Sequence, residues 1–168
     1  MGLAQDIARA IGGLYFTQRW DLQSIRVSVP GIAPGDAFDA NDTFGTLMTF
    51  GNVARQLGGS FTIVHARFFD YDDEGTEMRL HLFRRPVTLA ASDAAWTIAD
   101  TDLRHALDTI AFTTFRDHTA GQLGVASPAL YIKCDADQAS IYGGLQCIST
   151  PNIAAGSDPE IELVVARD

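Results

Sequence analysis

The chain has 168 residues, a length typical of one domain. Hydrophobic residues make up 46% and charged residues 20%, so the chain can build a core and lacks the composition of a disordered protein. Lys and Arg number 12 against 21 Asp and Glu, which gives a formal net charge of −9. Such a surface repels phosphate backbones, and no apolar stretch approaches the roughly 20 residues that span a bilayer. We therefore expect neither nucleic acid nor a membrane as a partner.

Residues 1–14 have the pattern of a short amphipathic helix. Leu3, Ile7 and Ile11 recur at helical spacing, and two glycines end the pattern. An early acidic residue and the lack of an apolar run argue against a secretory signal. We expect an N-terminal arm over 1–14, which either caps the core or packs on a neighbouring subunit, followed by one β-sandwich domain over 15–168.

From residue 22 onward the hydrophobic period changes to two, which is typical of strands with one buried face. One short helix is expected over 100–107, where Thr97 and Asp100 resemble a capping box and Leu103 and Leu107 lie four apart. The sequence predicts an all-β, jelly-roll-like sandwich of about eight or nine strands. The expected strands are 25–29, 44–50, 60–69, 76–83, 109–115, 129–134, 140–142 with 145–148, and 160–165.

Residues 70–75 are predicted to form the turn of a hairpin that pairs 60–69 with 76–83. In one register Arg67 faces Arg79, and a shift of two residues brings Glu77 opposite Arg67 instead, which the charges favour weakly. His65 and His81 face each other in the first register, so a metal site or a pH-sensitive pair is a minor alternative.

The outer face of this hairpin is expected to mix apolar and charged side chains. A sheet with such an outer face suits contact with another subunit. We therefore predict an interface, and the apolar arm is the second candidate contact. The predicted interface residues are Phe61, Ile63, Phe83, Leu3, Ile7 and Ile11.

The motifs that usually carry chemistry are absent or incomplete. Asp70, Asp72 and Glu74 match the first half of a calcium loop, but His81 stands where the bidentate carboxylate belongs. No nucleophile elbow, zinc-protease motif or phosphate-binding loop occurs. Cys134 and Cys147 lie in apolar surroundings and are predicted to be buried, reduced thiols. We expect no enzymatic activity, no metal and no cofactor.

Several motifs in residues 35–115 together resemble a known group of proteins. A strand is followed by Asn-Val-Ala-Arg and a Gly-rich turn, and then by Leu-x-Leu-Phe with a later Pro, Asp-Ala-Ala and Asp-x-Asp-Leu. These motifs lie at Asn52–Arg55, Gly58–Ser60, Leu80–Phe83 with Pro86, Asp93–Ala95 and Asp100–Leu103. The pattern resembles small structural proteins of tailed bacteriophages, of the kind that decorates or cements the capsid. It contains no catalytic residues.

The resemblance implies a virion protein, synthesised in the host cytoplasm and placed on the capsid surface. The expected partners are the major capsid protein and further copies of the chain, with a trimer favoured, and the net charge fits a protein that stays in solution before assembly. The alternative is a β-sandwich recognition module of a tail or fibre that binds host carbohydrate. Trp20, Trp96 and Tyr71 are the candidate stacking residues for that alternative.

Overall fold

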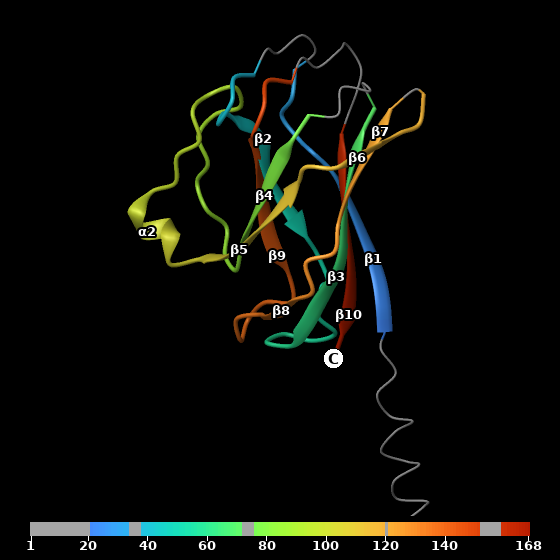
Figure 1. Ribbon diagram of the computed structural model, residues 1–168. Coiled ribbons are helices and arrows are strands. Elements are labelled where there is room, and N and C mark those ends of the chain that lie inside the picture. Colours follow the sequence, from blue (N-terminus) through green and yellow to red (C-terminus); the bar gives the residue numbers. More distant parts are fainter. Residues whose placement is uncertain (1–20, 34–37, 72–75, 120, 152–158) are drawn as a thin grey trace, which may run out of the picture.

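The computed structural model describes residues 21–33, 38–71, 76–119, 121–151 and 159–168 (Figure 1). The predicted arm over 1–14, including Leu3, Ile7 and Ile11, lies outside this part. Within the described ranges the elements are β1 (Asp21–Ser28), β2 (Thr43–Phe50), β3 (Ser60–Asp70), β4 (Met78–Phe83), α2 (Asp100–Leu103), β5 (Ala106–Phe112), β6 (Phe115–Asp117), β7 (Gln122–Ala126), β8 (Leu130–Lys133), β9 (Ile141–Cys147) and β10 (Glu160–Arg167).

The strands form two antiparallel sheets. The larger sheet has the order β1-β10-β3-β7-β6, with β8 also paired to β3, and the smaller sheet has the order β2-β9-β4-β5. From β1 to β4 the chain changes sheet at every strand, and the final strand returns to lie between β1 and β3. This is the strand order of a jelly roll. The predicted all-β, jelly-roll-like sandwich is confirmed.

The predicted hairpin between 60–69 and 76–83 is wrong. β3 belongs to the larger sheet and β4 to the smaller one, so the two strands do not pair. Arg67 therefore lies opposite Glu162 on β10, and His81 lies opposite Gly144 on β9, rather than facing residues of each other's strand. Both strands have an apolar face because both cover one core from opposite sides, and alternation alone does not identify a pairing partner.

A bulge in β3 explains why two predicted interface residues are buried. His65 pairs with Val164 and Ile63 with Val165, which leaves Val64 as the extra residue. An extra residue reverses the alternation of side chains along a strand. Phe61 and Ile63 consequently point into the core and are fully buried.

The third predicted interface residue of the sandwich is buried as well. Phe83 is 1% exposed. The pairing of β4 with β5 shifts register between Leu82 and Phe83, so the side chains of these two adjacent residues are both buried. Placing Phe61, Ile63 and Phe83 on an outer face is therefore wrong, because all three belong to the interior.

The core between the sheets is rich in aromatic rings. Phe68 of β3 lies 5.9 Å from Phe112 and 6.2 Å from Phe115, measured between ring centroids. Cys134 and Cys147 are buried and unbridged, as predicted. The largest fully buried side chains are Phe44, Phe50, Phe61, Phe68, Phe83, Phe112, Met48, Ile63, Met78, Leu80, Leu82 and Ile110.

Three further expectations about elements need correction. The helix is the single turn α2, and Ala99 is its N-cap without a side-chain bond, so Thr97 does not form the expected capping box. The expected strand 109–115 is divided between β5 and β6, whereas 140–142 and 145–148 belong to the single strand β9. β7 was not predicted, since Gly124 interrupts a short segment with few β-branched residues.

Candidate functional site

The two outer faces of the sandwich differ in what covers them. Residues 84–105, here called the covering segment, lie against the smaller sheet (Figure 1). Trp96 of this segment stacks on His81 with 4.3 Å between ring centroids, and the backbone N–H of Thr43 donates to the carbonyl of Ala94. The chain thus buries part of this outer face with its own residues.

The outer face of the larger sheet remains accessible in the described part of the chain. We call it the open face, and it consists of the outward side chains of β1, β10, β3, β7 and β8 together with neighbouring groups. Its members are Leu22, Ser24, Arg26, Glu160, Glu162, Val164, His65, Arg67, Phe69, Tyr71, Arg116, Leu123, Val125, Ser127 and Tyr131.

An ion pair lies across the middle of the open face. Nη1 of Arg67 is 2.7 Å from Oε2 of Glu162, and the hydroxyl of Ser24 donates to the same carboxylate. Partial burial acts to raise the pKa of Glu162, but the bonds from Ser24 and Arg67 outweigh it and hold that pKa below its usual value. The register places Arg26, Glu162 and Arg67 in one row across β1, β10 and β3, and Ser24 lies two residues along β1 from that row.

A second polar cluster lies beside the first. Tyr71 donates its hydroxyl to Oε2 of Glu160 at 2.6 Å, and Nη2 of Arg26 donates to the Tyr71 oxygen at 2.7 Å. The guanidinium of Arg26 also lies 3.9 Å above the ring of Phe69. The hydrogen bond to Glu160 is the main cause that raises the pKa of Tyr71. Exposed pairs of this kind contribute little stability, but they fix side-chain orientation.

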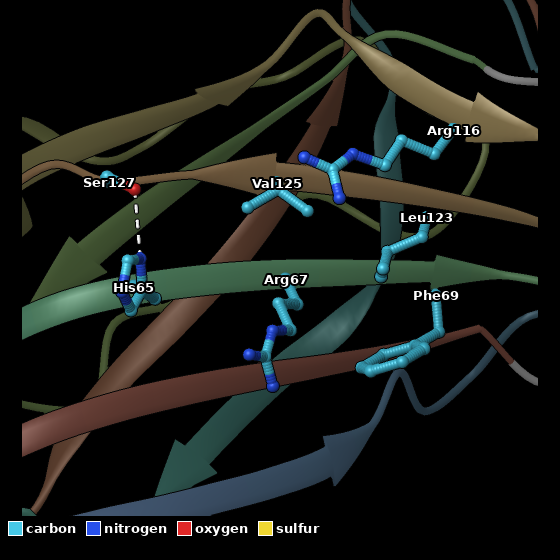
Figure 2. Close-up of a pocket in the computed structure, with 7 residues that line it drawn as sticks. All are labelled: His65, Arg67, Phe69, Arg116, Leu123, Val125 and Ser127. Atoms are coloured by element: carbon cyan, nitrogen blue, oxygen red, sulfur yellow. Dashed lines mark hydrogen bonds between the residues drawn. The ribbon is translucent and has the colours of Figure 1, made fainter.

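A hollow of about 410 Å³ opens between β3, β7 and β6 (Figure 2). Its apolar lining comes from Phe69, Leu123 and Val125, and its cationic groups are Arg67 and Arg116. At one end, Nδ1 of His65 is 2.9 Å from the hydroxyl of Ser127. Apolar walls with a few polar groups are typical of binding sites, and this volume lies within their range of about 300–1,000 Å³. We call this the Arg116 hollow.

The structure does not bring the predicted metal or stacking residues together. His65 and His81 belong to different sheets, and no group of three or more candidate metal ligands occurs among the described residues. Of the incomplete calcium motif, Asp70 is buried, while Asp72 and Glu74 lie outside the described ranges.

The stacking candidates also lie apart. Trp96 belongs to the covering segment and lines a hollow of about 240 Å³ with Leu103 of α2, whereas Tyr71 belongs to the open face. Trp20 lies outside the described residues. These residues therefore do not form one platform in the part of the chain that the structure describes.

Sequence reasoning missed most of the Arg116 hollow. Four of its residues, Arg116, Leu123, Val125 and Ser127, lie on β6 or β7 or directly after β7. The alternation of Leu123 and Val125 around Gly124 was the available signal, but it is too short to indicate a strand by itself.

Comparisons with known proteins give weak likenesses of fold. No known family and no curated protein matches the sequence. A carbohydrate-binding module, CBM27-1 of Caldicellulosiruptor saccharolyticus in complex with mannohexaose, is 10% identical with a TM-score of 0.33, covering 90% of this chain and 68% of that one. A pentamer of Israel acute paralysis virus is 8% identical with a TM-score of 0.29, covering 93% and 90%. A marine algae virus of the order Picornavirales is 13% identical with a TM-score of 0.21, covering 88% and 66%.

Likenesses of this strength carry no argument about function, which is left to the residues of this chain. Among the described residues, no helix has the length and apolar character needed to cross a membrane.

Proposed function

We propose that this chain is a bacteriophage decoration protein, which binds the outer surface of the head and stabilises contacts between major-capsid subunits. The observation that carries this proposal is the open face. Leu22, Tyr71 and Tyr131 on that face are 62%, 46% and 66% exposed, respectively. These side chains supply apolar and aromatic area on one face that is available for burial by a protein partner.

The charged groups of the open face support binding rather than catalysis. Arg67 is paired with Glu162, and Arg26 is paired with Glu160 at 2.5 Å. Groups held in mutual pairs present a fixed pattern of charge to a partner. We infer that the chain is not an enzyme and that this pattern selects the partner surface and its register.

The residues that resemble decoration proteins fit a structural role. Asp93 adopts a left-handed conformation with φ of 66°, and its N–H donates to the carbonyl of Thr43 at 3.0 Å. Oδ2 of Asp102 accepts a bond from the N–H of Thr88 at 3.0 Å. The first contact holds the covering segment on β2, and the second joins two parts of that segment; the opposite face of the molecule is left for a partner.

The proposed mechanism is burial of surface at many equivalent positions. Apolar area removed from water contributes about 25 cal/mol per Å², less the costs of association and ordering. In the proposed arrangement the chain forms a closed homo-oligomer, a trimer, so that several open faces engage the lattice together. Linked contacts then hold more strongly than any single contact.

The test uses phage heads that lack this chain, to which purified protein is added. Wild-type protein should bind to saturation and raise the temperature at which the heads release DNA. Leu22→Asp and Tyr131→Asp should bind at least tenfold more weakly, because each introduces a charge into a buried contact. Leu103→Asp is the matched control, since Leu103 is 54% exposed on α2, beside the covered face.

Circular dichroism of each variant shows whether the fold is intact. Failure of the folded wild-type protein to bind heads contradicts the proposal, and so does equal binding by all three variants. Saturable binding to a glycan array without binding to heads would favour the carbohydrate alternative instead.

A further inference from the structure

We propose that the Arg116 hollow binds the carboxylate of an acidic side chain on the capsid surface. This inference rests on the proposed function, because it names the chemistry that the open face recognises. The occupant is a Glu or Asp side chain of the partner protein, with its methylene groups on the apolar lining and its carboxylate at Arg116.

Arg116 differs from the other two arginines of the open face in its surroundings. Arg26 and Arg67 each pair with a glutamate of β10. The side chain of Arg116 extends from β6 over β7 toward Val125 (Figure 2). None of the ion pairs found among the described residues includes Arg116. Its guanidinium is therefore available to an external anion, and it offers a planar set of donors that matches a carboxylate.

The lining of the hollow favours a carboxylate attached to a short aliphatic chain over a free inorganic anion. Leu123, Val125 and Phe69 give one apolar side for methylene groups to cover. The paired His65 and Ser127 form a polar end that can exchange hydrogen bonds with the backbone of a bound segment. Arg67 lies on the same hollow and adds positive potential, although Glu162 already offsets its charge.

Because the chain is acidic overall, this site would help to orient the chain as it approaches an acidic partner surface. A net charge of −9 repels an acidic partner surface over most possible approaches. The exposed guanidinium of Arg116, beside the apolar side chains of the hollow, makes one approach favourable, in which an acidic group enters there. Charge complementarity of this kind sets the register of an interface and speeds its formation.

The first experiment measures binding of a peptide to the Arg116 hollow, using the full chain. The probe is a short acetylated peptide with glutamates between apolar residues, and the same peptide with glutamines is the control. In ¹H–¹⁵N spectra that record arginine Nε–H groups, the Arg116 signal should shift and saturate with the glutamate peptide only. Equal shifts with inorganic phosphate, with sialyllactose or with the glutamine peptide would overturn the proposal.

The second experiment measures binding to heads with two charge reversals. Arg116→Glu should weaken binding by about tenfold to a hundredfold, as expected for loss of one hydrogen bond to a charged group. Arg104→Glu is the matched control, because Arg104 is also exposed but follows α2 in the covering segment. Equal binding by both variants would overturn the proposal.

The two proposals fail in different ways. If wild-type protein does not bind heads, the proposed function is wrong, whatever the peptide titration shows. If wild-type protein binds heads and Arg116→Glu binds as well as Arg104→Glu does, the decoration role stands and the carboxylate site is wrong.

Discussion

Phe68 and Phe69 are neighbours in β3 that point to opposite faces of the sheet. Replacing each of them tests directly which face of β3 lies in the core and which belongs to the open face. Phe68 is 1% exposed and packs against Phe112 and Phe115. Replacing a buried Phe with Ala costs about 3–5 kcal/mol, because the transfer energy is lost and a cavity remains. For a chain of this size each kcal/mol lowers Tm by about 2–4 °C, so Phe68→Ala should lower Tm by about 6–20 °C.

Phe69→Ala should be much milder. Its ring is half-buried on the open face and loses chiefly the contact with the guanidinium of Arg26, which is worth about 0.5–1 kcal/mol at an exposed position. Urea unfolding and calorimetry of both variants measure the difference in the free energy of unfolding. A Phe69→Ala variant as unstable as Phe68→Ala would refute the assignment of the two faces.

Three further predictions concern packing and pH. Gly143→Ala would place Cβ 2.7 Å from a ring carbon of Phe50 and should cost about 1–3 kcal/mol in a urea titration; an unchanged midpoint would contradict the packing of β9 on β2. Burial raises the pKa of Cys147 to about 12, so stability should fall as pH rises from about 8.5 toward 12, and a thiol reagent should label this residue only after unfolding. Burial lowers the pKa of His81 below 6.5, so the unfolded chain takes up a proton first and stability should fall as pH drops below that value. An NMR titration should show the pKa of His81 moving back up in Trp96→Ala, and an unchanged pKa would show that Trp96 does not exclude water from His81.

Alternation of hydrophobic residues was enough to predict the fold class and most strands. β2, β3, β4, β8 and β10 lie close to their expected ranges, because each presents one face to a single core, whereas β1 begins four residues before its expected start. The partner of each strand was not predictable in the same way. β3 and β4 are close in sequence and share a pattern, yet they lie in different sheets, since a jelly roll changes sheet between them.

The bulge at Val64 shows a second limit of sequence patterns. Phe61 and Ile63 have the opposite parity to Ala66 and Phe68, so a regular strand would place them on opposite faces. One extra residue in β3 brings all four into the core, and the pairing with β10 that produces it is distant in sequence. Phe61 and Ile63 were predicted on an outer face for this reason.

The candidate site could not be predicted from the sequence, because it too depends on pairing between strands that are distant in sequence. β6 is three residues long and β7 contains a glycine, so neither has a distinct local pattern. Only the pairing of β7 with β3 and β6, which sets Arg67 opposite Val125 and Arg116 opposite Leu123, brings these residues to one hollow. The arm over 1–14 stays a prediction, since it lies outside the described residues.

The measurement that tests the central claim most directly is the copy number of this chain in purified virions, by quantitative mass spectrometry against the major capsid protein. A decoration protein must occur in numbers comparable to that of the major capsid protein, since it binds a repeated lattice. We expect such a ratio for this chain. A copy number of only a few per particle, or absence from the virion, would contradict it.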